Sequence, residues 1–384
     1  MNICYISTFP PEMCGIATYT RYLVDALLDL DEGISLTVLT KRGGGEEHSE
    51  RLTIIPCFSA GDYKDILPSL KGLRPQRPHL IHIQHEFGIF PAEENFLSFL
   101  KAVKAHGYPP IITLHTVYTR DTATTAGFDV DIEEYNCQIG NLVDCEIVHL
   151  DKPLRSVLLR MGIPKEKIET IPHGTELLEL LGSSQAKKRL GLPKGRLILS
   201  FGFIKRSKNQ LSLIEALPLI VKDVPDAYLF IAGYSRIMDP NDISYIKLCK
   251  ERARELGIED RVVFSDEFIA EQDVHIVFSA ADCCCCLDNE ESRSGSGALH
   301  LALGSGKPII ASRIPKFEEE LMRHVSDEIL HLPNNIQGIA KTIVKIFKDE
   351  RFANQIAKSI RQYALGTSWK ETAKKHLTLY KRFL

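Results

Sequence analysis

Several features that would place this chain in a special class of protein are missing from its sequence. The 384 residues contain no run of about 18 apolar residues, the length that a membrane-spanning helix requires. The start, MNICYISTFPP, lacks a basic segment followed by an apolar one, so we expect no signal peptide there. No low-complexity segment is evident. These absences favour a globular protein of two ordinary domains.

An excess of charge of either sign is also missing. There are 47 Lys and Arg against 50 Asp and Glu, a net charge of -3, which argues against a nucleic-acid partner. Of ten cysteines, four are consecutive, Cys283 to Cys286, and no C-x-x-C pair recurs at zinc-ligand spacing. Neighbours on a strand point to opposite faces, so this run suits a buried strand of small residues. We therefore expect reduced thiols and a cytoplasmic setting.

What the sequence does contain is an alternation of strand-length apolar runs with helical patterns. The predicted strands are residues 2–8, 35–40, 52–56, 79–84, 110–115, 145–150 and 168–172 in the first half, and 197–202, 227–233, 261–265, 283–287 and 307–312 in the second. Such alternation predicts an α/β fold with parallel sheets covered by helices. The stretch 176–195 lacks strand character and is interpreted as the linker.

The most informative stretch is residues 281–320, which begins with the cysteine strand. A loop of small residues follows, Ser294-Gly295-Ser296-Gly297, and then a helical segment. A loop of this kind, at the carboxyl end of a parallel strand and opening a helix, binds anions because its N–H groups point outward and its glycines leave space. A purely structural loop is the alternative. Gly15 also opens a predicted helix, but without the G-x-G-x-x-G fingerprint of dinucleotide sites.

Two sets of basic and polar residues follow predicted strands. Lys205 and Lys208 come after the first strand of the second half and could neutralise a diphosphate, although a solvated basic loop is equally expected. His85, His115 and His173 fall at the carboxyl ends of first-half strands, with Glu86 beside His85. We expect them to meet at one edge of the sheet. They lack the spacing of metal ligands on a shared helix, so no metal site is predicted.

Two further segments allow a functional and a structural interpretation. Within Glu318–Glu320, one carboxylate could accept hydrogen bonds from sugar hydroxyls, or the run could simply complement a helix N-terminus. Residues 96–104 form a basic amphipathic pattern, for which contact with a membrane surface is the alternative to core packing.

Taken together, these motifs resemble the retaining glycosyltransferases of the GT-B fold, in the large family 4 that includes many mannosyl- and glucosyltransferases. The resemblance covers nearly the whole chain. It is carried by FPPEMCGIATYT, QHEFGIF, ITLHTVY, IPHGTE, FGFIKRSKNQLSLIEAL, the loop segment AADCCCCLDNEESRSGSGALHLALGSGKPIIAS, and SWKETAKKHLTLY. It implies two Rossmann-like domains facing each other across a cleft. These would be residues 1–175, with the helix 366–384 packing back on them, and residues 176–365.

The resemblance also implies roles for individual residues. Lys205, Lys208 and His115 would be catalytic. The donor would be bound by Gly15, Arg293, Ser294, Ser296, Gly297 and Glu319, and the acceptor-side candidates are His85, Glu86 and His173. The implied reaction moves a hexose from a nucleotide diphosphate sugar to the hydroxyl of a sugar or glycan, without metal or other cofactor. GDP-mannose and UDP-glucose are the donors most frequent in such a family.

One departure from the family pattern concerns the donor loop. The family normally carries two glutamates eight residues apart, and these places hold Arg293 and Leu301 here. Since the second glutamate usually holds the ribose, Leu301 puts ribose recognition in question. The chain looks similar to a subgroup with Ser-Gly in that loop. A nucleotide-sugar-binding relative without activity, a sugar phosphorylase and a nucleotide-sugar epimerase remain alternatives, and the oligomeric state is open.

Overall fold

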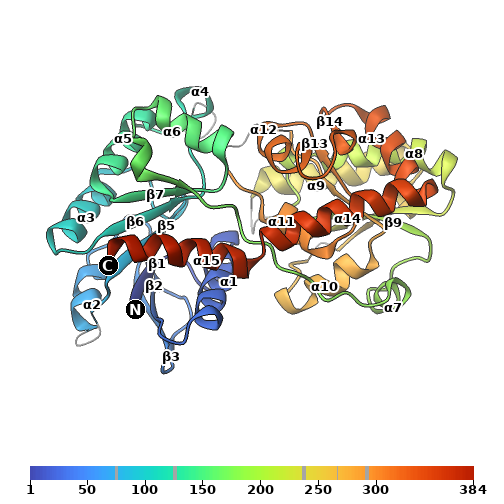
Figure 1. The fold of residues 1–384 in the computed structure, drawn as a ribbon. Coiled ribbons are helices and arrows are strands. Elements are labelled where there is room, and N and C mark those ends of the chain that lie inside the picture. The colour runs from blue at the N-terminus through green and yellow to red at the C-terminus, as the bar shows by residue number, and fades with distance from the viewer. Residues whose placement is uncertain (74–76, 124–127, 236–238, 266, 290–293) are drawn as a thin grey trace. The chain divides into compact units, whose positions relative to one another are not determined.

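The computed structural model describes residues 1–73, 77–123, 128–235, 239–265, 267–289 and 294–384. Its contacts divide the chain into two compact α/β units (Figure 1). Unit 1 comprises Met1–Gly174, Thr367–Leu384 and residues 294–297, and unit 2 comprises residues 175–289 and 298–366. Residues 294–297 are thus grouped with unit 1, although the predicted boundaries assigned them to the second domain.

Unit 1 is built on a sheet of eight strands. They are β1 (Asn2–Ile6), β2 (Ser35–Lys41), β3 (Glu47–His48), β4 (Leu52–Phe58), β5 (Leu80–His85), β6 (Pro110–Leu114), β7 (Cys145–Val148) and β8 (Ile168–Thr170). Their order is β3-β4-β2-β1-β5-β6-β7-β8, and every pairing is parallel except that of β3 with β4. The first strand therefore lies inside the sheet, with the chain growing first to one side of it and then to the other.

Unit 2 repeats this plan with six strands, all parallel. They are β9 (Arg196–Phe201), β10 (Ala227–Ala232), β11 (Val262–Phe264), β12 (Cys283–Cys286), β13 (Ile309–Ser312) and β14 (Leu330–His331), in the order β11-β10-β9-β12-β13-β14. The cysteine strand β12 lies between β9 and β13, and its first three thiols are buried, as the sequence predicts.

Helices cover both sheets. Unit 1 has α1 (Gly15–Leu30), α2 (Ile66–Gly72), α3 (Glu94–Ala105), α4 (Arg120–Ala123), α5 (Ile132–Leu142), α6 (Ser156–Arg160) and α15 (Trp369–Tyr380). Unit 2 has α7 (Ser183–Arg189), α8 (Gln210–Asp223), α9 (Pro240–Glu255), α10 (Glu271–Ala280), α12 (Pro315–Phe317), α13 (Ile336–Lys348) and α14 (Glu350–Gly366), and α11 (Gly297–Ser305) follows the loop of residues 294–297. The predicted linker thus contains a helix, α7, which its polar sequence concealed.

Shorter helical turns connect these elements. They are η1 (Asp151–Arg155), η2 (Lys165–Lys167), η3 (Arg206–Lys208), η4 (Glu259–Arg261), η5 (Glu318–Met322), η6 (Asp327–Ile329) and η7 (Lys381–Phe383). Turns η3 and η5 belong to the candidate site of unit 2, because they follow the carboxyl ends of β9 and β13.

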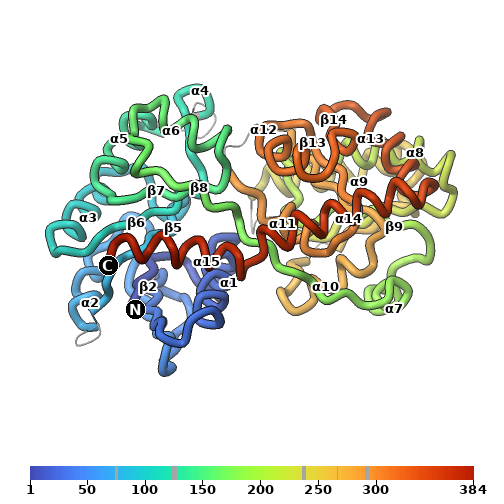
Figure 2. Tube along the Cα trace, in the orientation of Figure 1, coloured from blue at the N-terminus to red at the C-terminus, as the bar shows by residue number. Residues whose placement is uncertain are grey.

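Each face of the unit 1 sheet has its own hydrophobic core. One core packs α2, α3, α5 and α6 against the sheet, and the other packs α1 and α15, as Figures 1 and 2 show for α15 beside α1 and for α3 beside α5. Ser368 caps α15 by accepting a hydrogen bond from the Glu371 N–H (3.4 Å), the pattern expected of a helix start. The last helix is therefore an integral part of unit 1.

The amphipathic helix α3 uses its apolar face for core packing. Phe96, Leu97, Phe99, Leu100 and Val103 are all buried. The structure thus favours the core interpretation of this helix over the membrane-contact alternative, because its apolar residues are already covered. Over the residues that the structure describes, none of the helices combines the length and the apolar character that a membrane span requires.

Candidate active site

In each unit, one gap between neighbouring strands marks the place where the chain reverses its direction of growth across the sheet. This switch point lies between β1 and β5 in unit 1 and between β9 and β12 in unit 2. Open parallel sheets bind ligands just beyond the carboxyl ends of the strands at such points, where the connecting loops diverge. The predicted site residues can therefore be located relative to these two edges.

At the edge of unit 1, the start of α1 is open. Cys14 caps this helix, its Sγ accepting from the Ala17 N–H (3.3 Å). Gly15 is the first helical residue and is exposed, and a Cβ added there would meet no atom within 4 Å. The first turn of the helix therefore has no side chain at its first position, a geometry that lets an anionic ligand approach the backbone N–H groups of a helix start.

Three histidines gather beside α1 around a tyrosine. The rings of His115, His149 and His173 lie 4.7, 5.3 and 5.0 Å from the ring of Tyr19, and Trp369 of α15 lies 5.0 Å from it. His115 and His173 were predicted to meet at this edge. His149 was missed, although it directly follows β7, because the predicted strand extended past it to residue 150.

His115 is held from both sides. Its Nε2 lies 2.8 Å from Gln84 Oε1 and its Nδ1 lies 3.2 Å from His149 Nε2, while His149 Nδ1 donates to the Ile171 carbonyl (3.1 Å). Burial, with a further contribution from His149 and His173, holds the pKa of His115 well below its usual range. His115 is therefore a neutral ring whose orientation is fixed by its neighbours.

The hydrogen bonds continue from Gln84 through the interior to α15. The amide of Gln84 lies 3.3 Å from His82 Nε2, and His82 Nδ1 lies 2.6 Å from the Tyr380 hydroxyl. Tyr380 in turn lies 2.7 Å from the Tyr5 hydroxyl. His82 Nε2 also contacts Thr113 Oγ1 at 2.7 Å. A buried polar chain thus joins the last helix to the histidines at the sheet edge.

The acceptor-side candidate on the same strand, His85, faces elsewhere. His85 follows Gln84 and so points to the opposite face, where its ring packs against Phe87, Phe90 and Phe96. Burial lowers its pKa to about 3. The structure therefore places His85 in the core and not with His115 and His173. The sequence signal for this placement is that successive side chains of a strand point to opposite faces of the sheet.

Glu86, just beyond β5, does lie at the sheet edge. Its Oε2 accepts from Thr116 Oγ1 (2.7 Å) and its Oε1 from the Phe87 N–H (3.2 Å). Burial raises the pKa of this carboxyl, although these two hydrogen bonds act in the opposite direction. The half-buried carboxylate is therefore fixed in position beside the strand ends β5 and β6.

The edge of unit 2 carries charges instead. Lys208, in turn η3 after β9, lies 3.0 Å from Asp288, which follows β12. Lys316, in α12 after β13, contacts Oδ2 of the same carboxylate, which Lys208 also reaches at 3.1 Å. Lys208 was predicted, whereas Asp288 and Lys316 were not. Both stand directly after a predicted strand or turn, but only the tertiary structure brings them together.

Burial determines how these three groups behave. Asp288 and Lys316 are only 5% and 3% exposed, while the Lys208 side chain keeps 28% of its surface. Burial alone would raise the pKa of Asp288, but Lys208 and Lys316 more than offset it and hold the pKa below its usual range. Burial lowers the pKa of Lys316, because it disfavours the charged ammonium group, and the nearby Asp288 acts in the opposite direction. Lys205, at the start of the same turn, is half-buried.

Two backbone segments of unit 2, after β9 and after β10, approach each other closely at this edge. A Cβ on Gly233, after β10, would come within 1.8 Å of the Gly202 carbonyl oxygen, after β9. Both glycines have positive φ, 158° and 112°. A Cβ on Gly202 would in turn lie 3.8 Å from Ala298 at the start of α11. The N-terminal end of α11 therefore lies near the carboxyl end of β9 with little side-chain bulk between them.

The remaining donor-loop candidates are partly described. Arg293 lies outside the described residues. Ser294 forms an isolated bridge with Thr116, Ser296 is buried, and the exposed Gly297 begins α11. Leu301, at the place of the missing glutamate, packs against the hydrophobic core of unit 2. The apolar side chain is thus accommodated by the core.

The carboxylates after β13 divide into an inner and an outer residue. Glu320 is buried and accepts from His300 Nε2 (2.7 Å), and His300 Nδ1 lies 2.6 Å from Thr175 Oγ1. Glu319, the predicted sugar contact, is half-buried on turn η5. Glu320 therefore has a structural role in joining α11 to the start of unit 2.

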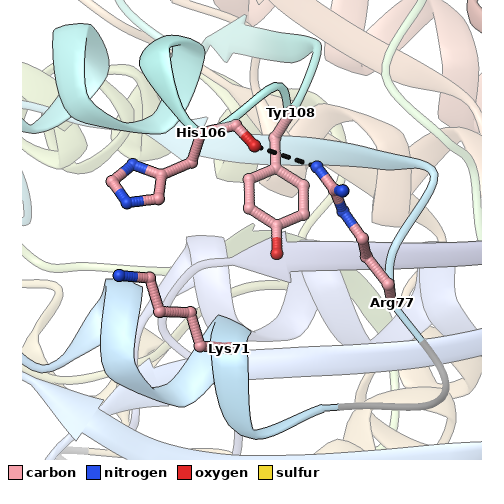
Figure 3. A pocket seen from close by; sticks show the side chains of 4 residues that line it. All are labelled: Lys71, Arg77, His106 and Tyr108. Atoms are coloured by element: carbon pink, nitrogen blue, oxygen red, sulfur yellow. Dashed lines mark hydrogen bonds between the residues drawn. The ribbon is translucent and has the colours of Figure 1, made fainter.

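Two other features concern metal binding and a surface cavity. Among the described residues, no group of three or more His, Cys, Asp or Glu side chains could hold a metal ion. A cavity of ≈ 410 Å³ is lined by Lys71, Arg77, His106 and Tyr108 (Figure 3). It lies at the amino ends of β5 and β6, away from the switch-point edge, and Arg77 donates there to the His106 carbonyl (2.9 Å).

The comparison with solved structures identifies the class of fold. Sucrose-phosphate synthase from Thermosynechococcus elongatus superposes with a TM-score of 0.76 at 20% identity, covering 100% of this chain and 98% of the other. Anabaena HepE in complex with UDP and glucose gives a TM-score of 0.74 at 16% identity and covers 100% of both chains. These similarities show a GT-B fold, as predicted.

Sequence comparison then identifies the family. The model for glycosyltransferase family 4 matches residues 13–177, and that for glycosyl transferases group 1 matches residues 183–363. The chain belongs to the family 4 glycosyltransferases of the GT-B fold. Mannosylfructose-phosphate synthase of Agrobacterium fabrum is 26% identical over 224 residues, 56% of this chain and 48% of that protein. The match thus spans about half the length of this curated relative.

Proposed function

We propose that this protein is a retaining glycosyltransferase that moves a hexose from a nucleotide diphosphate sugar to an acceptor hydroxyl. The observation that carries the proposal is the cationic edge of unit 2. There Lys208 and Lys316 share one carboxylate beside two close-packed glycine turns and the start of α11. Clustered lysine ammonium groups and a backbone that a ligand can approach closely suit a diphosphate. GDP-mannose and UDP-glucose are the proposed donors, and HepE, which shares the fold, binds UDP and glucose.

In the proposed reaction, the bond between the anomeric carbon and the diphosphate oxygen breaks, and its electron pair stays with the diphosphate. Lys205 and Lys208 stabilise the charge that builds up there. The acceptor oxygen bonds to the anomeric carbon on the same face, and its proton passes to an oxygen of the leaving phosphate. This scheme requires no resident metal or other cofactor. Gly15, Ser294, Ser296, Gly297, Arg293 and Glu319 are the proposed donor contacts.

Unit 1 supplies a neutral polar surface in this proposal. His115 is the proposed contact to the donor sugar, and Glu86 and His173 are the proposed acceptor-side residues. Because both ring nitrogens of His115 already have partners, a sugar hydroxyl would have to replace one of them, either Gln84 or His149. His85 is not retained among the acceptor-side residues, because it lies in the core.

The test is to replace Lys208 by alanine and to measure transfer from a panel of UDP-, GDP- and ADP-sugars. We expect kcat/KM with the true donor to fall by about 10²–10³, the loss typical of one group that stabilises developing charge. Arg206→Ala is the matched control, because Arg206 lies in the same turn but stacks over the Tyr245 ring at 5.5 Å. Unchanged kcat/KM in Lys208→Ala would refute the assigned role.

The same panel separates the proposed function from its alternatives. Donor binding without transfer to any acceptor would indicate a nucleotide-sugar-binding relative without activity. Sugar release that depends on phosphate would indicate a phosphorylase, and conversion of the donor to its epimer would indicate an epimerase.

A further inference from the structure

The edge of unit 2 carries a lysine, Lys316, that was not among the predicted diphosphate contacts. Lys208, Lys316 and Asp288 come from loops after β9, β13 and β12, which are neighbours in the sheet. Two ammonium groups therefore share one carboxylate in a site that water reaches only partly. Lysines gathered at such a sheet edge suit an anionic ligand.

The two lysines are not equivalent within this group. Lys316 is 3% exposed and its Nζ sits against one oxygen of Asp288, so it has no path to solvent comparable to that of Lys208. The side chain of Lys208 is 28% exposed and contacts the same carboxylate at 3.0 Å. Lys208 can therefore turn toward a ligand, while Lys316 remains with Asp288.

From this difference we propose that Lys316 is a positioning residue for the donor diphosphate. By neutralising Asp288, it keeps Lys208 from being held in a one-to-one ion pair and leaves its ammonium group available to the phosphate oxygens. The inference rests on the proposed function, since it takes the diphosphate of a nucleotide sugar as the anion.

Removal of Lys316 has a specific consequence in this arrangement. Asp288 then has Lys208 as its remaining lysine partner, and a buried carboxylate with a single cation binds it strongly. The phosphate must compete with Asp288 for that cation, so diphosphate affinity falls even though Lys316 itself does not contact the ligand. Removal of Asp288 as well abolishes the competition and restores the affinity.

The experiment compares the native protein with Lys316→Met and with the double variant Lys316→Met/Asp288→Asn, using calorimetric titration with pyrophosphate, UDP and GDP. We expect Kd for the bound probes to rise about tenfold in the single variant and to return to within about twofold of native in the double variant. In transfer assays the single variant should raise the KM for the donor more than it lowers kcat.

A matched control lies at the other end of the same strand. Lys187 is also a buried lysine, and its Nζ lies 2.8 Å from Asp282, which precedes β12. Lys187→Met therefore removes a buried lysine from a partly exposed aspartate at the amino end of the strand. It should lower the melting temperature without changing Kd for the three probes, and this separates loss of stability from loss of positioning.

Two results would overturn the inference: a native Kd in Lys316→Met, or a double variant that binds as weakly as the single one. The second result would mean that Lys316 contacts the phosphate directly or acts only in folding. If the native protein binds none of the three probes, this inference and the proposed function fail together. If the expected pattern appears without transfer to any acceptor, the positioning role stands and only the transfer assignment is wrong.

Discussion

The two units place different chemistry at the same edge of the same kind of sheet. At the edge of unit 1, histidine, glutamine and tyrosine side chains satisfy one another in a buried chain, and the pKa of His115 lies well below its usual range. At the edge of unit 2, two lysines share one aspartate. The fold alone therefore does not determine the chemistry at a sheet edge, because the residues of the loops that follow the strands supply the functional groups.

This difference predicts how each edge responds to a mutation or to a ligand. A neutral polar network fixes the orientation of its members and costs stability when one member is removed. A cluster of lysines attracts a ligand of opposite sign, and binding of that ligand stabilises the folded state. Unit 1 is thus expected to respond mainly to broken hydrogen bonds, and unit 2 mainly to changes in charge.

The largest effect is expected from Asp288→Ala in unit 2. This change leaves Lys208 and Lys316 without their shared carboxylate, and loss of one partner of a buried ion pair costs about 3–5 kcal/mol. Urea denaturation followed by circular dichroism measures the loss in the free energy of unfolding. Asp223→Ala, which breaks an exposed pair with Lys348, is the control and should change it by less than about 1 kcal/mol. A similarly small loss for Asp288→Ala would show that the lysines are effectively solvated.

A smaller effect is expected in unit 1 from Tyr380→Phe. The hydroxyl lies 2.6 Å from His82 Nδ1 and 2.7 Å from the Tyr5 hydroxyl, so its removal leaves two buried polar groups without this partner. The expected loss is about 2–4 kcal/mol in the same denaturation experiment. Tyr108→Phe, at the surface cavity of Figure 3, is the control and should be nearly neutral. Equal losses in both variants would contradict the importance of the buried chain.

The smallest effect concerns the pH dependence of unit 1. Glu146 in β7 is fully buried, and neither carboxyl oxygen has a hydrogen-bond partner among the described residues. Burial raises its pKa to about 8, partly offset by Lys167. Because the folded pKa is raised above the ordinary value of 4.5, the stabilising contribution is complete below about pH 4.5 and is lost as the pH rises toward 8.

Glu146→Gln replaces the protonated carboxyl by a neutral amide of the same shape. At pH 7 the variant should be more stable than the native protein by about 1–2 kcal/mol, and its free energy of unfolding should fall less between pH 5 and pH 8. Denaturation at several pH values measures this. Both proteins should lose stability below about pH 6.5, because histidines such as His376, whose pKa burial lowers to about 4, must then charge. Parallel curves for the two proteins above pH 6.5 would show that Glu146 is already ionised in the folded state.

Much of the fold was predictable because buried parallel strands appear in the sequence as short runs of apolar residues. Every predicted strand corresponds to an observed one, and the two missed strands, β3 and β14, have only two residues each. Helix α1 begins at Gly15 as predicted. Helix α7 was missed since its polar residues, rich in lysine, carry little apolar periodicity.

The candidate site was predictable where a side chain directly follows a strand and its loop has a recognisable composition. Lys208, Gly15, His115 and His173 were identified in this way. Lys316 was missed because the three glutamates that follow it in the sequence were interpreted as the functional residues there. His85 was expected to meet His115 and His173, which is wrong, because successive side chains of a strand point to opposite faces.

The sequence by itself determined the α/β class, the division into two halves and the loops that carry lysine, glycine and histidine, because these depend on local periodicity and composition. Only the tertiary structure decided which of these side chains meet. Strand order brings the loops after β9, β12 and β13 together, and the resulting exclusion of water turns three ordinary charged residues into a coupled cluster. Strand order and burial are properties of the whole chain, and no local pattern in the sequence specifies them.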